Sequence, residues 1–292
     1  MKTRVISGVI GIVLSLLVLS VFNTAALNIV GIILYAITLY EIHHALKEKN
    51  VIWTSLLLFV AGAVVIVEPK FIFEGNPMLL MAVFAFCFAS IVVFNFEKIE
   101  FKTVASNVAF GIYVLVGFYS ICRLQIVLPY EKFGWDGAFL FVFSAVIAWG
   151  GDISAYFSGV LFGKHKLAPV LSPKKTVEGA IGGVIGSVVF TWLFLWAYSL
   201  IKPIAEGTNI VYEMDLKIIA IVGLVAFAGS IVGMIGDLFA SAIKRQTGIK
   251  DYGNIMPGHG GIIDRFDSVF LVAPLISSMA GFIAAAGGIF YV

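Results

Sequence analysis

The sequence predicts an all-α fold, a polytopic membrane bundle of about nine transmembrane helices, from three observations. Hydrophobic residues make up 61% of the 292 positions and charged residues only 12%, whereas a soluble globular domain carries about 25% charged residues. The mean hydropathy is +1.05. Apolar runs near the roughly 20 residues that a helix needs to cross a bilayer recur along the whole chain. Lipid is therefore the expected solvent for most of the molecule, and a net charge of +2 gives no reason to expect nucleic acid binding.

Nine apolar runs lie between clusters of charged residues, and each is expected to form one helix. The first run holds 18 residues, more than the roughly 7–15 of a signal-peptide core, so we expect an uncleaved anchor. The third run is short, and the sixth and eighth are long and contain carboxylates. The expected spans are 5–22, 25–42, 51–67, 77–95, 104–127, 136–162, 177–201, 216–243 and 266–290.

The distribution of lysine and arginine predicts how these spans are oriented. If the N-terminus and the even-numbered loops share one side, that side holds 14 of the 19 basic residues. The positive-inside rule then places the N-terminus in the cytoplasm. Residues 1–130 would contain about five spans, and residues 131–292 a catalytic region of about four spans. The short termini favour a bacterial plasma (inner) membrane. The five basic residues on the other side are Lys70, Arg123, Lys132, Lys202 and Lys217.

The first polar constellation lies at the end of the sixth span. Asp152 stands inside an apolar run, where a carboxylate costs about 2.5–3.5 kcal/mol and normally faces a polar cavity or a partner. On a helix, Asp152, Tyr156, Gly159 and Gly163 share one face, and the glycines would let a ligand approach. The alternative is that Asp152 pairs with a lysine for packing alone.

The basic turn before the seventh span predicts a phosphate-binding site. Pro173 suits a first helical turn with Ser172 as its cap. Free backbone N–H groups there, together with Lys174 and Lys175, would cradle a phosphate. An ordinary basic turn flanking the membrane is an equally good interpretation of this motif taken alone.

A second constellation runs from Gly236 to Asp267. Asp237, Ser241 and Lys244 share a helical face, and Asp237 would lie about 10 Å before Lys244 at 1.5 Å per residue. That spacing places a carboxylate just below the cytoplasmic interface.

Asp264 and Asp267 open the ninth span three residues apart, so they share a face if that segment is helical. Neighbouring carboxylates repel each other unless a cation joins them, and oxygen ligands without paired Cys or His suit Mg²⁺ better than zinc. The glycines around His259 can approach a ligand closely. A charge effect at the start of a helix could explain one of these aspartates.

The 27 residues from Ser241 to Asp267 resemble the signature of the CDP-diacylglycerol synthases, also called phosphatidate cytidylyltransferases. Met256 stands where Leu, Ile or Phe is expected, which is a mild departure. The stretch from Asp152 to Gly179 also resembles the preceding region of that family. The matching features are Ser241, Lys244-Arg245, Lys250-Asp251, Gly253, Pro257, His259-Gly260-Gly261, Asp264-Arg265 and Asp267.

The resemblance implies a reaction in which CTP and phosphatidic acid give CDP-diacylglycerol and pyrophosphate with Mg²⁺, a second cation being left open. It implies that Asp237 and Asp264 hold the metal, with Asp267 and Asp152 close by, and it implies a homodimer. We expect Asp237, Asp264, Asp267, Lys244, Arg245 and His259 to be catalytic. His259 is expected to be a hydrogen bonder to phosphate or the metal shell more than an acid or base. The expected substrate-binding residues are Asp152, Tyr156, Ser172, Lys174, Lys175, Ser241, Lys250, Asp251, Gly260, Gly261 and Arg265.

Two other functions fit parts of the pattern. One is a CTP-using membrane transferase that acts on an ether lipid phosphate or a polyprenol, for which nearly the same motifs would serve. The other is a transporter or channel with Asp152 and Asp237 as ion sites. A transporter would more often show two comparable halves, whereas the polar motifs here gather in one half.

Overall fold

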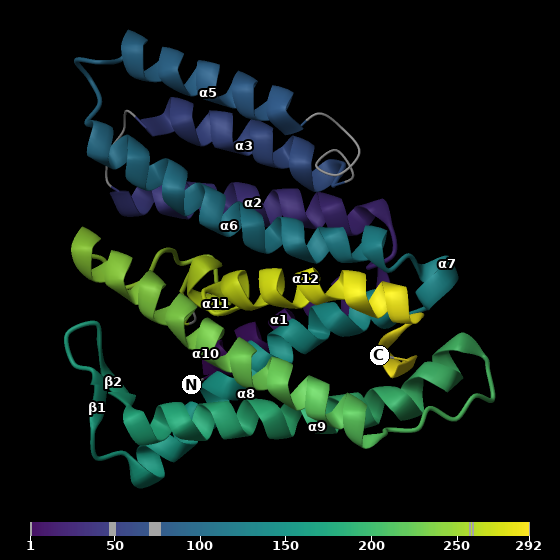
Figure 1. Ribbon diagram of the computed structural model, residues 1–292. Helices are drawn as coiled ribbons and strands as arrows, with labels where there is room; N and C mark the ends of the chain where they lie inside the picture. Colours follow the sequence, from purple (N-terminus) through teal and green to yellow (C-terminus); the bar gives the residue numbers. More distant parts are fainter. Residues whose placement is uncertain (1, 47–50, 70–76, 257, 259, 292) are drawn as a thin grey trace. The chain divides into compact units, whose positions relative to one another are not determined.

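The computed structural model describes the chain except for residues 1, 47–50, 70–76, 257, 259 and 292 (Figure 1). Most of the described residues form helices, and two short strands pair in a small hairpin. The longer helices are α1 (Lys2–Ser20), α2 (Ala25–Leu46), α3 (Ile52–Val67), α5 (Pro77–Phe94), α6 (Phe101–Val127), α8 (Asp136–Phe162), α9 (Val177–Glu206), α10 (Leu216–Thr247) and α12 (Val269–Ala286). The short elements are α7 (Tyr130–Phe133), β1 (Lys166–Ala168), β2 (Ser172–Thr176), α11 (Ile263–Phe266) and the 3₁₀ helix η2 (Ile289–Tyr291).

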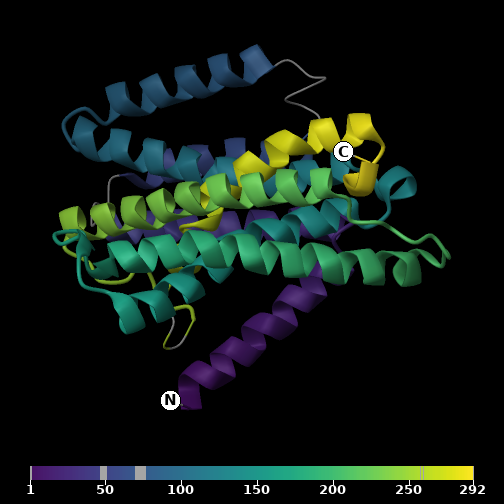
Figure 2. The same ribbon diagram turned by 60° about the horizontal axis from the view of Figure 1, so that its bottom comes forward.

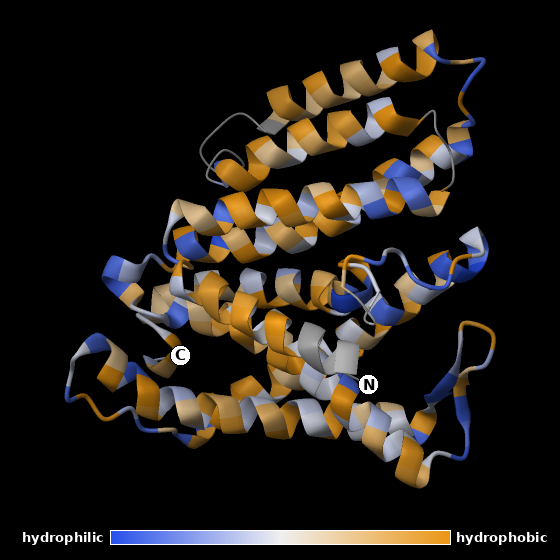
Figure 3. Cartoon of the chain, turned by 180° about the vertical axis from the view of Figure 1, so that it is seen from behind, coloured by the Kyte–Doolittle hydropathy of each residue, from blue (hydrophilic) through white to orange (hydrophobic). Residues whose placement is uncertain are grey.

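The helices confirm an all-α polytopic membrane protein. Among the described residues, six helices are long and apolar enough to cross a bilayer: α2, α6, α8, α9, α10 and α12. Three shorter apolar helices coincide with the remaining expected spans, so the count of nine and the side of the N-terminus stay predictions. Figure 3 shows the helices coloured mainly as apolar and the connecting loops mainly as hydrophilic. Large apolar side chains such as Phe86 and Ile185 are more than half exposed, as suits a surface solvated by lipid.

The chain divides into two compact units. Unit 1 comprises Met1–Ile126 and Ile243–Phe266, and unit 2 comprises Val127–Ala242 and Asp267–Val292. Helix α10 ends inside unit 1. Residues 248–266, which follow it and are called the motif segment below, therefore belong to the same unit as the N-terminal helices. Figure 2 shows α1 leading away from the other helices of unit 1.

The core of unit 1 forms around Tyr35 of α2, which is fully buried. Its hydroxyl lies 3.3 Å from the carbonyl oxygen of Leu58 in α3 and 3.5 Å from that of Gly111 in α6. Close by, the buried Asn107 of α6 donates a hydrogen bond of 2.9 Å to Thr54 Oγ1 of α3. In a bilayer such groups have no water to bind, so these contacts hold the three helices together.

Small residues bring α8 and α9 together in unit 2. Gly151 and Gly159 of α8 lie against Gly183 and Gly179 of α9, and added methyl groups would meet the facing backbone or hydroxyl groups. Ser187 donates a hydrogen bond of 2.8 Å from Oγ to the carbonyl of Ile147. Close approach through glycine and serine is the usual way in which membrane helices pack.

A buried ion pair joins the start of α8 to the end of α9. Asp136 is fully buried and accepts hydrogen bonds from Lys202 Nζ at 2.6 Å and from Tyr198 at 2.7 Å. The backbone N–H of Ile289 donates to the other carboxylate oxygen at 3.1 Å, which fastens the C-terminal 3₁₀ turn to the same group. Each polar group here has a partner, as burial requires.

Candidate active site

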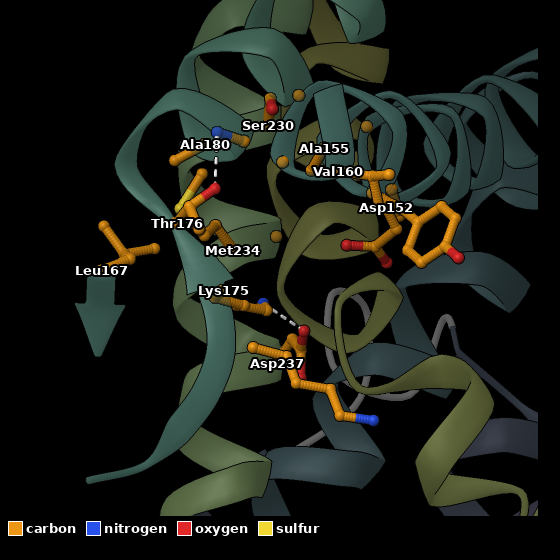
Figure 4. A pocket seen from close by; sticks show the side chains of 18 of the residues that line it. Asp152, Ala155, Val160, Leu167, Lys175, Thr176, Ala180, Ser230, Met234 and Asp237 are labelled. Atoms are coloured by element: carbon orange, nitrogen blue, oxygen red, sulfur yellow. Dashed lines mark hydrogen bonds and ion pairs between the residues drawn. The ribbon is translucent and has the colours of Figure 1, made fainter. Parts of the chain in front are cut away.

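A cavity of about 530 Å³ opens in unit 2 between α8, α9, α10 and the hairpin (Figure 4). Its volume is within the usual range of ligand pockets, about 300–1,000 Å³. Most of the lining is apolar. The polar and charged lining residues are Asp152, Tyr156, Lys166, Lys174, Lys175, Thr176, Ser230 and Asp237.

Asp237 lies on α10 and forms an ion pair with Lys175, which reaches it from the end of β2 (Figure 4). The two side chains are only 21% and 25% exposed. Ser241 Oγ lies 3.4 Å from the other carboxylate oxygen, as expected for positions four apart on a helix. The predicted helix through Asp237 and Ser241 is thus confirmed, and the carboxylate has a cationic partner.

Asp152 of α8 faces the same cavity, where its charge interacts with those of Asp237 and Lys175. The Ser268 hydroxyl donates a hydrogen bond of 3.3 Å to its Oδ2. Tyr156 and Gly159, one and two turns further along α8, also line the cavity. The predicted polar face of this helix is therefore confirmed, and Gly163 stands at its C-terminal end.

The sequence analysis did not predict the hairpin. Its expectation that Ser172 caps a helix and Pro173 lies in the first helical turn was wrong. Both residues lie in β2, which pairs antiparallel with β1. Helix α9 begins at Val177, and its cap is Thr176, whose hydroxyl accepts the Gly179 N–H at 3.1 Å. Two antiparallel strands satisfy backbone groups that a helix would otherwise have paired. Ser172 is not among the residues that line the cavity, whereas Lys174 and Lys175 are.

Glu178 fixes the base of the hairpin. Its Oε2 accepts the backbone N–H groups of Lys164 at 3.1 Å and His165 at 3.2 Å, and its Oε1 lies 2.6 Å from His165 Nδ1. These three contacts join the start of α9 to the segment that leaves α8. They fix the base of the hairpin, whose residues Lys166, Lys174 and Lys175 line the cavity.

Asp264 organises the motif segment of unit 1. Its Oδ1 accepts a hydrogen bond from Lys244 Nζ at 2.8 Å, and its side chain is only 4% exposed. Its Oδ2 accepts the backbone N–H groups of Tyr252 at 2.8 Å and Gly261 at 3.0 Å. Gly260 has a positive φ of 87°, and an added Cβ would lie 2.9 Å from this carboxylate, which explains a glycine at this turn.

Sequence reasoning missed Glu41, which lies on α2 in the N-terminal half and is 1% exposed. Its two carboxylate oxygens accept the backbone N–H groups of Ile262 at 2.9 Å and Ile263 at 3.0 Å. An acidic residue near the end of an apolar span was the available signal.

Asp267 does not continue the helix that carries Asp264. Helix α11 ends at Phe266 and α12 begins at Val269, so the expectation of one helical face for the two aspartates was wrong. Asp267 is 8% exposed, and its Oδ1 accepts the backbone N–H of Ser268 at 2.8 Å. Gly236 of α10 leaves room for the Asp267 carbonyl, from which an added Cβ would be 2.6 Å away.

The other predicted residues lie at the surface or outside the described chain. Arg245, Lys250, Asp251 and Arg265 are exposed. His259 lies outside the described residues, as does Pro257.

The cavity carboxylates fit Mg²⁺ better than a transition metal. In the part of the chain that the structure describes, no three His, Cys, Asp or Glu side chains converge as a ready-made metal cage. Mg²⁺ is usually held by one or two carboxylates together with waters and substrate phosphates. Asp237 and Asp152, with the Ser268 hydroxyl beside them, supply such a set of hard oxygen atoms.

The comparisons with known proteins agree with this chemistry. The sequence model of the cytidylyltransferase family matches residues 2–283. A phosphatidate cytidylyltransferase of Staphylococcus aureus (strain COL) is 32% identical over 283 residues, which are 95% of this chain and 98% of that protein. The proteins of the same name from Staphylococcus haemolyticus (strain JCSC1435) and Staphylococcus saprophyticus are each 39% identical over 142 residues, about half of this chain and half of each relative.

Proposed function

The chain belongs to the cytidylyltransferase family and is a nucleotidyltransferase enzyme, and from that premise we propose that it transfers the cytidylyl group of CTP to phosphatidic acid. The products are CDP-diacylglycerol and pyrophosphate. The names of its relatives support the substrate pair. The observation that carries the proposal is the cavity of unit 2, where Lys175, Asp237 and Asp152 meet beside further lysines.

The proposed step joins one anion to another. A phosphate oxygen of phosphatidic acid forms a bond to the α-phosphorus of CTP. The bond from that phosphorus to the oxygen bridging to the β-phosphate breaks, and pyrophosphate leaves with the electron pair. A phosphomonoester has a second pKa of about 6, so the nucleophile is already largely dianionic at neutral pH and needs no general base.

The protein must therefore supply positive charge and alignment. Lys166, Lys174 and Lys175 of the hairpin line the cavity and would neutralise the triphosphate. Electrostatic interactions are stronger in such a partly apolar site than in water. Fixed cations that face the transferred group and hold it in line with the leaving pyrophosphate lower the barrier.

We propose Mg²⁺ as the cofactor, held in the cavity of unit 2 by Asp237 with Asp152 beside it. The family resemblance implies Asp264 and Asp267 as further metal residues. When bound, the ion neutralises phosphate charge and stabilises the leaving oxygen. The ammonium of Lys175 already demonstrates that Asp237 takes a cationic partner. The remaining residues proposed for phosphate or nucleotide contact are Tyr156, Ser241, Lys244, Arg245, Lys250, Asp251, His259, Gly260, Gly261 and Arg265.

We also propose that the enzyme lies in the plasma (inner) membrane with its active site facing the cytoplasm. The bias of basic residues to one side supports this orientation. CTP would arrive from water and the lipid from the bilayer. A homodimer is proposed from the family resemblance alone.

The test uses CTP labelled at either of two phosphates. Purified protein in detergent is incubated with phosphatidic acid, Mg²⁺ and CTP that carries ³²P at the α or the γ position. Cytidylyl transfer moves the α label into the lipid extract and leaves the γ label in water-soluble pyrophosphate. Transfer of the γ label to lipid would refute the proposal, since that result means phosphoryl transfer. Polyprenyl phosphate as sole acceptor tests the related transferase, and label transfer to it alone would replace phosphatidic acid as the substrate.

A further inference from the structure

Glu41 is a buried carboxylate that accepts two backbone hydrogen bonds from the motif segment. It lies on α2, more than 200 residues before the segment in sequence, and both belong to unit 1. Its oxygens accept one backbone N–H each, from Ile262 at 2.9 Å and from Ile263 at 3.0 Å. A carboxylate that is 1% exposed would be costly without such partners. Hydrogen bonds to a charged acceptor are among the stronger ones in proteins.

Two glycines of the motif segment, Gly253 and Gly261, lie directly against the Glu41 carboxylate. A Cβ added to Gly253 would lie 2.5 Å from Glu41 Oε1, and one added to Gly261 would lie closer still. Real Cβ atoms essentially never approach so near. A side chain at either position would displace the Glu41 carboxylate from its place beside the backbone, a reason for glycine that the motif alone does not reveal.

The same stretch of backbone also carries Asp264. The N–H of Gly261 points to Asp264, and the next two N–H groups along the chain point to Glu41. Tyr252, at the other end of the segment, is 1% exposed, packs on Phe110 of α6 with ring centres 5.6 Å apart, and donates its N–H to Asp264. Two carboxylates thus fix the segment, one from within and one from α2.

We propose that Glu41 is a positioning residue for the reaction, which holds the backbone of residues 261–263 and through it the side chain of Asp264. This inference rests on the proposed function for its catalytic consequence. It gives α2 a role in holding Asp264, although the polar motifs lie in the other half of the sequence.

The test combines Glu41→Gln with amide hydrogen exchange and steady-state kinetics on the full-length protein. Glutamine keeps one acceptor oxygen and turns an NH₂ group toward the other backbone N–H. We expect amide exchange at Ile262 and Ile263 to become about tenfold faster. A tenfold change corresponds to a loss of about 1.4 kcal/mol in the free energy that protects these amides. We expect kcat to fall by about 10- to 100-fold, since small misplacement of reacting groups has effects of that size, with KM for CTP changed far less.

Two further variants separate positioning from general stability. Gly253→Ala pushes the Glu41 carboxylate away from the segment, and we expect the same faster exchange at Ile262 and Ile263 and the same loss of kcat. Thr38→Ala is the matched control because Thr38 is fully buried on α2 and donates its hydroxyl to the Tyr35 carbonyl of the same helix. It should leave both readouts close to those of the wild type.

Unchanged exchange at residues 261–263 in Glu41→Gln would overturn the inference. Faster exchange spread over α2, α3 and α6 would also overturn it, because it would show a purely structural role. If the wild-type protein failed to transfer cytidylyl groups, the proposed function would be lost, and the exchange pattern would still decide whether Glu41 holds the segment.

Discussion

The replacement of Asp237 by Asn tests the chemistry of the cavity most sharply. Asparagine keeps the shape of the side chain and one acceptor oxygen but removes the charge that faces Lys175. Hydrogen bonds to charged groups are worth about 1.5–3 kcal/mol, and Asn retains part of that interaction, so we expect a loss of about 1–2 kcal/mol in the free energy of unfolding. Such a loss leaves a protein folded when its total stability is about 5–15 kcal/mol.

The effect on catalysis should be far larger than the effect on folding. A fixed polar group that acts on developing charge is worth about 10²–10³-fold in rate, or about 2.7–4 kcal/mol. We therefore expect Asp237→Asn to lower kcat by at least about 10²-fold. Pyrophosphate release measures the rate, and thermal unfolding in the same detergent measures the stability.

A double-mutant cycle with Lys175→Met then tests whether the ion pair itself matters. Each single variant leaves one charge of the pair without its partner, whereas the double variant removes both. We expect the combined rate loss to be smaller than the product of the two single losses, with a coupling energy of about 1–3 kcal/mol. Full activity in Asp237→Asn would refute the reasoning, and exact additivity would refute the role of the pair.

Three further predictions follow from other parts of the structure. Lys244→Ala removes a 2.8 Å contact with Asp264, so KM for a phosphate-bearing substrate should rise about tenfold; unchanged kcat and KM for both substrates would count against it. Lys202→Met leaves the fully buried Asp136 unpaired, and thermal denaturation should show a loss of about 3–5 kcal/mol that adding Asp136→Asn largely reverses; a stable single variant would contradict this. Chelation of divalent ions should stop pyrophosphate release and Mg²⁺ should restore it, whereas activity that survives EDTA would exclude the proposed cofactor.

The sequence predicted the helices well because each depends on a local property. A long apolar run must satisfy its own backbone hydrogen bonds in lipid, and a helix does so within one segment. The face of α8 that carries Asp152 and Tyr156, and that of α10 that carries Asp237 and Ser241, followed from helical spacing alone.

The hairpin of residues 166–176 was missed because proline and serine before an apolar run suit a helix start equally well. The observed cap is Thr176, four residues later than expected. In the folded chain the hairpin is held by Glu178, which accepts hydrogen bonds from the backbone N–H groups of Lys164 and His165. That contact spans the loop and has no sequence pattern of its own.

The role of Glu41 was also missed because it depends on contacts between residues far apart in the sequence. Its partners Ile262 and Ile263 are over 200 residues away, and they bind through backbone N–H groups that any residue could supply. The glycines at 253 and 261 were recognised as part of a motif. The Glu41 carboxylate beside them, which favours glycine at both positions, is visible only in the folded chain.

The most direct test of the central claim is pyrophosphate release by the purified protein with CTP, phosphatidic acid and Mg²⁺, each omitted in turn. We predict that pyrophosphate appears only when all three are present, and that Asp237→Asn abolishes it. Release that continues without phosphatidic acid would contradict the claim, because it would show nucleotide hydrolysis. No release from folded protein with all three present would contradict it as well.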